Sequence, residues 1–376
     1  MVGSDTTLGD GLGEQGFVSF LDRLLKRRNP PMIGLDISSS SVKLVELDQN
    51  ASGQYVLERL AFQSLEKGWI TDGQIERFDE VVEAIKRLIA RSGTGTRKVI
   101  MGMPQAAVIT KKIILPAGLR EDEMEVQVEA EANQYIPFSL DEVSLDFCVI
   151  GPSPASMDDV EVLIAASRKD RVQDRQSLAE AAGLEPVVLD IESHASRLAI
   201  SRWTACLPRQ GKDALLALFE IGADNTGLKV LCNGELLYDR DQAFGGSQLT
   251  SMISRNFALS FDDAERKKVD GGLPQEYVTD LLEPFVDSLA QEIGRALQYF
   301  FTSTPHHKVD YVLLAGGTAA LPGLAVRVTE LTGFESMVVN PFDLMQMGSA
   351  ASSSTLEKGA PSFLIASGLA MRRFVQ

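Results

Sequence analysis

Apolar residues recur along the chain with two spacings, every second residue in short runs and every third or fourth residue in longer segments. The first spacing predicts strands and the second predicts amphipathic helices. In the first half they predict strands at 32–37, 42–47, 55–62, 97–104, 107–116, 160–167 and 185–191, and helices at 78–91, 120–135, 172–182 and 193–205. Strands that alternate with helices in this way predict an α/β fold.

The second half, which opens at Asp213, shows the same two spacings. They predict strands at 215–222, 227–234, 235–244, 310–317 and 337–342, and helices at 246–257, 262–268, 274–301 and 362–374. The dipeptide Asn233-Gly234 predicts a two-residue turn between antiparallel strands, because both residues tolerate positive φ.

One arrangement occurs twice in this pattern. Asp36 ends a strand and precedes a polar turn and a second strand, and Glu220 does the same 184 residues later. That distance is far beyond the repeat of a solenoid. The repetition therefore predicts two related α/β halves, each presenting an acidic hairpin turn to a cleft between them, where ligands often bind.

The first 31 residues differ from the rest. Residues 1–16 have no periodicity and predict a disordered tail. Residues 17–28 predict a short basic amphipathic helix that the two prolines 30 and 31 end. Such a helix can lie on an anionic membrane, and it can equally pack on the body of the protein or stay mobile.

Composition excludes several classes of protein. The net charge of −16 argues against a nucleic-acid partner, because phosphate backbones bind positively charged surfaces. Three widely spaced cysteines and three histidines offer no disulfide framework and no zinc-ligand spacing. No apolar run reaches the about 18 residues of a membrane span, and the N-terminus does not resemble a signal peptide. These features predict a cytoplasmic protein. The carboxylates of the acidic helix at 120–135 are expected to form a solvent-exposed face of that helix.

The paired turns predict phosphate binding, because small residues expose consecutive backbone N–H groups and hydroxyls add donors. The donors belong to Ser38, Ser39, Ser40 and Ser41 in the first turn and to Ala223, Asp224, Asn225 and Thr226 in the second. Asp36 and Glu220 would repel a bare phosphate but could hold Mg²⁺ through water. Lys43 follows the first turn and either neutralises phosphate charge or is a surface lysine of the strand.

Two glycine pairs extend this prediction. Gly316-Gly317 stands at the end of a predicted strand before Thr318, where a flat ligand could approach the backbone closely. Gly245-Gly246 precedes a predicted helix, whose N-terminus could face a phosphate or a ribose. Each pair can also be a plain turn between a strand and a helix.

The order of these motifs resembles that of the actin-like ATPase superfamily. The segments GLDISSSSVKLVEL, EANQYIPF, LIAASRKDRV, AGLEPVVLDIES and LLAGGTAALPGL are similar to those of the type IV pilus assembly protein family PilM. The similarity runs from about residue 33 to the C-terminus.

The resemblance implies an actin-like (ribonuclease H-like) duplicated two-domain fold with a nucleotide cleft and an FtsA-like 1C subdomain. Domain 1 would span 32–212, with subdomain 1C at about 103–170. Domain 2 would span 213–376, with helical subdomain 2B at about 245–307. The helix at about 362–374 would return to domain 1, and residues 1–31 would lie outside both.

The resemblance also implies roles for individual residues. Asp36 with Ser38–Ser41 would form the first phosphate motif, and Glu220, Gly222 and Ala223–Thr226 the second. Gly316, Gly317 and Thr318 would face adenosine, Glu265 and Lys268 would contact adenine or ribose, and Glu192 would polarise the attacking water. Relatives often carry glycine in place of Ser38 and aspartate in place of Glu220, so hydrolysis would be slow at most.

The implied function is an ATP- or ADP-binding, Mg²⁺-dependent cytoplasmic scaffold of the type IV pilus platform on the inner membrane. A groove of domain 1 near Gln134–Phe138 and Val108–Leu115 would take the N-terminal peptide of the membrane protein PilN, which would hold the scaffold at the membrane. Other platform and motor components would be further partners, and a homo-oligomer is compatible with this role. The alternatives are an FtsA-like filament protein and a sugar-kinase-like enzyme on the same fold.

Overall fold

The computed structural model describes residues 30–349 and 359–375. The chain divides into two units, Met1–Pro31 and Met32–Gln376, and every helix and strand of the described ranges belongs to the second unit. The tail expected at 1–16 and the helix expected at 17–28 lie outside the described residues.

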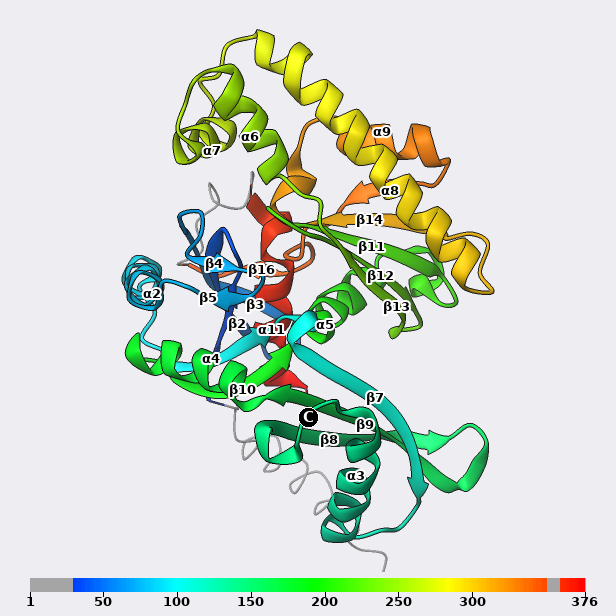
Figure 1. Cartoon of the computed structure of the whole chain (residues 1–376). Coiled ribbons are helices and arrows are strands. Elements are labelled where there is room, and N and C mark those ends of the chain that lie inside the picture. The colour runs from blue at the N-terminus through cyan, green and yellow to red at the C-terminus, as the bar shows by residue number, and fades with distance from the viewer. Residues whose placement is uncertain (1–29, 350–358, 376) are drawn as a thin grey trace, which may run out of the picture. The chain divides into compact units, whose positions relative to one another are not determined.

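The first half is built on a six-stranded sheet in the order β10-β6-β1-β2-β3-β16 (Figure 1). Strands β1, β2 and β3 are antiparallel neighbours, whereas β1, β6 and β10 run parallel. The strands are β1 (Ile33–Ile37), β2 (Ser41–Gln49), β3 (Tyr55–Ser64), β6 (Lys98–Met103), β10 (Glu185–Ile191) and β16 (Gln346–Met347). All five residues of β1 are buried, because helices cover both faces of the sheet.

The second half repeats this topology in a five-stranded sheet of order β13-β12-β11-β14-β15. Strands β11, β12 and β13 are antiparallel neighbours, and β11, β14 and β15 are parallel. The strands are β11 (Leu215–Ile221), β12 (Thr226–Cys232), β13 (Glu235–Gln242), β14 (Tyr311–Ala315) and β15 (Ser336–Val338). The expected turn at Asn233-Gly234 joins β12 to β13 with φ of 50° and 80°. The prediction of two related α/β halves is confirmed.

Two helices lie between the sheets. Helix α5 (Glu192–Thr204) and helix α11 (Leu364–Met371) contribute to a core shared with residues of both sheets. A Cβ at Gly368 would lie 1.8 Å from the Ala195 carbonyl oxygen, and one at Gly34 would lie 2.3 Å from that of Ala366. Glycine is therefore required where α11 contacts α5 and β1. Helices α2 (Phe78–Ser92) and α4 (Lys169–Ala181) cover the other face of the first sheet.

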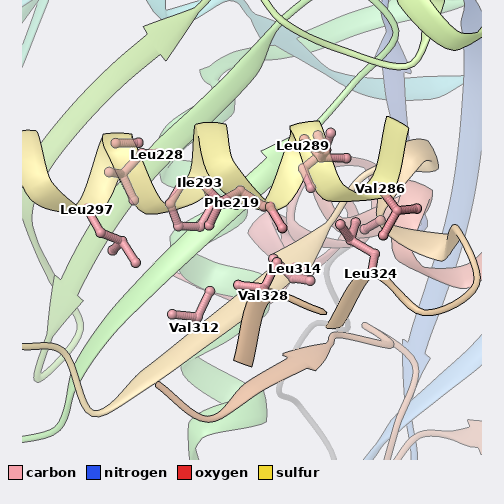
Figure 2. Packing of buried hydrophobic residues seen from close by; sticks show 14 of the residues in the cluster. Phe219, Leu228, Val286, Leu289, Ile293, Leu297, Val312, Leu314, Leu324 and Val328 are labelled. Carbon is pink, nitrogen blue, oxygen red and sulfur yellow. The ribbon is translucent and has the colours of Figure 1, made fainter. Parts of the chain in front are cut away.

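The outer face of the second sheet carries the largest core. Figure 2 shows Leu289, Ile293 and Leu297 of α8 (Glu283–Ser303) facing apolar residues of the sheet and of α9 (Leu324–Thr332). Phe219, on β11, is 1% exposed within this cluster. Burial of one such side chain is worth about 1.5–3 kcal/mol. Helices α6 (Ser247–Asn256) and α7 (Phe261–Asp270) continue this layer.

A three-stranded antiparallel sheet stands between β6 and α4 in the sequence. Its order is β7-β9-β8, and α3 (Glu121–Tyr135) packs on it through Met124 and Val128. The strands are β7 (Val108–Pro116), β8 (Val143–Ser153) and β9 (Ser156–Arg168). Strand β8 was missing from the sequence prediction, although Val143, Leu145 and Phe147 alternate with polar residues; the alternation stops at Cys148, and Cys148–Ile150 are exposed. The hairpin of β4 (Ile70–Thr71) and β5 (Gln74–Ile75) was also not predicted.

The single helix expected at 274–301 is wrong in detail. A π-helical stretch, Val278–Leu282, precedes α8. Pro284 has no N–H to donate to the preceding turn and its ring crowds the carbonyl four residues earlier, which favours a wider turn. Across the described ranges 30–349 and 359–375, no helix combines the length and the apolar character needed to cross a bilayer.

Candidate functional site

The first acidic turn carries a buried ion pair. Asp36 stands opposite Lys43 in the β1–β2 hairpin, and Lys43 Nζ donates to Asp36 Oδ2 over 3.0 Å. Asp36 is 3% and Lys43 6% exposed, so the interpretation of Lys43 as a surface lysine is wrong. The turn is closed by Ser38, whose N–H donates to the Ser41 carbonyl over 2.9 Å. The backbone carbonyl of Ser40 accepts a hydrogen bond from the Leu65 N–H.

The second turn has an equivalent pair. Lys229 on β12 forms an ion pair with Glu220 on β11 and is 6% exposed. Ser196 of α5 donates to the other oxygen, Oε1 of Glu220, over 2.6 Å. Burial alone would lower the pKa of Lys229, but attraction to the carboxylates of Glu220, Asp239 and Asp241 is stronger, so the pKa of Lys229 is raised above its usual value. Lys229 therefore stays charged, and each half contains an acid–lysine pair beneath its turn.

A hydrogen bond links the two turns. Ser39 Oγ of the first turn donates to Asp224 Oδ2 of the second over 2.7 Å. In the second turn itself, the Gly222 N–H donates to the Asn225 carbonyl over 2.9 Å, and Thr226 Oγ1 donates to the Phe244 carbonyl over 2.7 Å. The two predicted phosphate motifs, remote in sequence, are thus brought together.

The glycine pairs meet at the same place. The Gly222 carbonyl accepts hydrogen bonds from Thr318 Oγ1 at 2.8 Å and from the Gly246 N–H at 3.0 Å. A Cβ at Gly245 would lie 2.3 Å from the Ala223 carbonyl oxygen, so only glycine allows this approach. Gly316 has a φ of 91°, whereas Gly317 is exposed, with open space where a Cβ would stand.

Helix α7 is tied to the N-terminus of α6 through charged and polar side chains. Lys268 Nζ donates to Glu265 Oε2 over 2.6 Å and to Thr250 Oγ1 over 2.8 Å. Thr250 also hydrogen-bonds to Glu265, and Lys268 reaches the Gly246 carbonyl at 3.5 Å. Glu265 and Lys268 therefore adjoin the Gly245-Gly246 turn.

Glu192 begins α5, close to both acidic turns. Burial is the first cause that raises the pKa of Glu192 to about 7, and repulsion from Asp36 and Glu220 adds to it. Arg175 and Lys229 oppose the rise. Three carboxylates thus lie in one electrostatic neighbourhood, where a divalent cation would be favoured. Across the described part of the chain, no group of three or more His, Cys, Asp or Glu residues stands close enough to ligate a metal directly.

This pKa predicts a pH-dependent stability that Glu192→Gln should abolish. Between pH 4.5 and about 7, Glu192 is protonated in the folded chain and ionised in the unfolded chain. The contribution of Glu192 to the free energy of unfolding is therefore fully present below pH 4.5 and is lost as pH rises through 7. We expect urea unfolding to show the variant more stable than the wild type at pH 8, by roughly 3 kcal/mol at most. Glu125→Gln on the exposed face of α3 is the control. Parallel pH profiles for the wild type and Glu192→Gln would contradict this expectation.

Four residues of the site were not predicted from the sequence: Arg175, Ser196, Lys229 and Thr250. For Lys229 a signal existed, because the second strand of each hairpin carries a lysine, in SVKLV and in TGLKV. The other three lie on helices whose placement beside the turns depends on tertiary packing.

Two surface hollows lie elsewhere, on either side of Val326 in α9. Their volumes are about 300 and 440 Å³, and their linings are mainly apolar. The first includes Ala319, Ala320 and Leu321, which directly follow Thr318. Neither hollow is lined by the acidic turns.

Comparison with known proteins gives consistent results. The family described as type IV pilus assembly protein PilM matches residues 34–374. The cell division protein FtsA of Bacillus subtilis (strain 168) is 23% identical over 346 residues, which cover 79% of this chain and 75% of FtsA.

Solved structures agree. A PilM-PilN type IV pilus biogenesis complex superposes with a TM-score of 0.76 at 30% identity, covering 93% of this chain and 100% of the other. The ethanolamine utilization protein EutJ from Carboxydothermus hydrogenoformans gives a TM-score of 0.52 at 16% identity, covering 91% and 90% of the two chains, and shows the fold alone. The fold expected from the sequence, the duplicated actin-like fold, is confirmed.

Proposed function

Because the chain belongs to the type IV pilus assembly protein PilM family, we propose that it is a nucleotide-binding scaffold of the pilus assembly machinery. One observation supports nucleotide binding above the others. The Gly222 carbonyl receives hydrogen bonds from Thr318 and Gly246, while Ser39 bonds to Asp224 in the same turn. Both phosphate turns, the adenosine segment and a helix N-terminus therefore gather at one place, as ATP or ADP requires.

We propose the following roles for the residues there. The N–H groups and hydroxyls of Ser38–Ser41 and of Gly222–Thr226 bind phosphates, and Gly316, Gly317 and Thr318 face adenosine. Glu265 and Lys268 contact the adenine or the ribose beside Gly245-Gly246. Glu192 orients an attacking water, and hydrolysis is slow at most.

The carboxylates fit Mg²⁺ held through water, and Asp36 fits it better than Glu220. Lys43 donates to Oδ2 of Asp36, and the other carboxylate oxygen of Asp36, Oδ1, has no hydrogen-bond partner among the described residues. Both oxygens of Glu220 are engaged, by Ser196 and by Lys229. Bound Mg²⁺ would neutralise phosphate charge, and the ion pair with Lys43 would orient the Asp36 carboxylate for it.

We further propose that the partner is the N-terminal peptide of a PilN-like membrane protein, which would bring the chain to the inner membrane. A relative at 30% identity forms a complex of PilM with PilN. Near the expected groove, the aromatic residues Tyr135 and Phe138 are 46% and 38% exposed, and Ile114 is 55% exposed. Such side chains suit an extended apolar peptide.

The proposal is tested by calorimetry on the full chain after it has been stripped of nucleotide. We expect Mg·ATP and a synthetic PilN-like N-terminal peptide each to bind, and Mg·ATP at 100 times its Kd to stabilise the fold by about 2.7 kcal/mol. Absence of Mg·ATP binding would overturn the nucleotide site. Absence of peptide binding would overturn the scaffold role without touching the fold.

A further inference from the structure

The turn between β3 and β4 carries an exposed lysine at its tip. Lys67 is the second residue of a four-residue turn in which the Trp69 N–H donates to the Glu66 carbonyl over 3.3 Å. Gly68, the third residue, has a φ of 86°, which glycine adopts without strain. On either side of the tip, Leu65 belongs to the buried core of the first half and Trp69 packs against that core. The tip is therefore exposed but anchored at both ends.

This tip reaches helix α7 of the second half. Lys67 Nζ lies 4.4 Å from the ring centroid of Phe261, the first residue of α7, where the face of the ring attracts the ammonium group. The backbone at Phe261 is well positioned, because Ser260 caps the helix and its Oγ accepts a hydrogen bond from the Asp263 N–H over 3.1 Å. The contact between Lys67 and Phe261 therefore bridges the two halves of the chain.

Both sides of this contact adjoin the proposed nucleotide site. The Leu65 N–H, two residues before Lys67, donates to the Ser40 carbonyl of the first turn over 2.8 Å. On α7, Glu265 follows Phe261 by four residues and shares its face of the helix. Glu265 is one of the residues that we propose for the adenine or the ribose. The contact thus joins a segment tied to the first phosphate turn with the helix proposed for adenosine.

A second bridge between the halves starts from the same turn. Ser39 Oγ donates to Asp224 Oδ2 over 2.7 Å, and Ser39 directly precedes Ser40, whose carbonyl holds Leu65. A few residues of backbone therefore connect the bridge at Ser39 to the bridge at Lys67. Because of this short connection, the two bridges are expected to form and break together when the halves move relative to each other.

We propose that Lys67 and Phe261 form a clasp across the two halves that controls the exchange of nucleotide at the proposed site. The clasp consists of protein groups alone, so it closes over an empty site as well as over a filled one. It therefore slows both entry and release of nucleotide, and Lys67 acts as a positioning residue of the cleft without touching the ligand. This role rests on the proposed function, whereas the contact of Lys67 with Phe261 does not.

The first test measures exchange by stopped-flow fluorescence of the full chain with a fluorescently labelled Mg·ADP. We expect Lys67→Met to raise the association and dissociation rate constants alike, by about two- to fivefold, the factor that corresponds to an exposed cation–π contact. The Kd should stay nearly the same. Phe261→Leu should have the same effect, and the double variant should add nothing to it. Lys67→Arg should behave like the wild type, because a guanidinium also binds over an aromatic ring.

Lys86→Met is the matched control, because Lys86 is an exposed lysine on α2, away from both turns. It should leave both rate constants unchanged. Faster release of nucleotide with weaker affinity and unchanged association in Lys67→Met would mean that Lys67 touches the nucleotide, and would overturn the clasp. Unchanged rate constants in Lys67→Met would overturn it as well.

A measurement without nucleotide decides the contact itself. Lysines that carry isotope-labelled dimethyl groups keep their charge, and the NMR signal of Lys67 is identified by its loss in Lys67→Arg. We expect this signal to be shifted upfield by the ring of Phe261 and to lose the shift in Phe261→Leu. A Lys67 signal that does not respond to Phe261→Leu would overturn the clasp. If calorimetry shows no Mg·ADP binding by the wild type, the proposed function fails, but the NMR result still decides the contact.

Discussion

Asp36→Ala is expected to lower the free energy of unfolding by about 3–5 kcal/mol and to abolish Mg·ATP binding. The change leaves Lys43, 6% exposed, without its counter-charge, and an unpaired buried charge is among the most costly defects in a protein. It also removes the carboxylate that we propose for Mg²⁺. Urea unfolding measures the first effect and calorimetry the second.

Two variants separate these effects. Asp36→Leu combined with Lys43→Met replaces the pair by apolar groups and should regain most of the stability, but it should still not bind Mg·ATP. Glu46→Ala is the matched control, because Glu46 is also a buried acid, held by Arg59, Thr94 and Thr96 away from the turns. It should lose stability and keep nucleotide affinity. Nucleotide binding by the double variant would refute the role of Asp36.

Gly317→Leu is expected to weaken Mg·ATP binding at least 100-fold while leaving the stability of the nucleotide-free chain nearly unchanged. Gly317 is exposed, its φ is not positive, and a Cβ there meets no atom within 4 Å. A leucine side chain would therefore occupy the space that we assign to adenosine without disturbing the fold. Calorimetry and urea unfolding on the same preparation measure the two quantities.

The matched control is Gly95→Leu, an exposed glycine with equally open surroundings before β6. It should change neither stability nor affinity. Gly316 is unsuitable, because its φ is 91° and a Cβ there would lie 2.4 Å from the Ile221 carbonyl oxygen, so any substitution would be destabilising. Normal nucleotide affinity in Gly317→Leu would place the ligand elsewhere.

The duplication extends to the chemistry of the two halves. Each hairpin has an acid on its first strand and a lysine on its second, and both lysines are 6% exposed. Buried ion pairs add little net stability compared with apolar packing. Two of them at equivalent places are therefore better explained by the ligand than by folding.

The periodicity of the chain was sufficient for the repeated strand–turn–strand units, because a strand buried on both faces is a continuous apolar run bounded by polar turns. It failed at β8, where the alternation of apolar and polar residues stops after Phe147, and at residues 278–282, where Pro284 modifies an otherwise helical segment. Asp36, Glu220 and the glycine pairs were predicted because local turn chemistry depends on residue type at fixed spacing.

The sequence by itself determined the fold class, the family and the residues of both turns. Only the tertiary structure decided that Ser39 reaches Asp224, that Thr318 and Gly246 meet at Gly222, and that Ser196 of α5 donates to Glu220. The physical reason is distance along the chain. Local propensities act over a few residues, whereas these contacts join segments tens to hundreds of residues apart, and only the packing of helices on the two sheets brings them together.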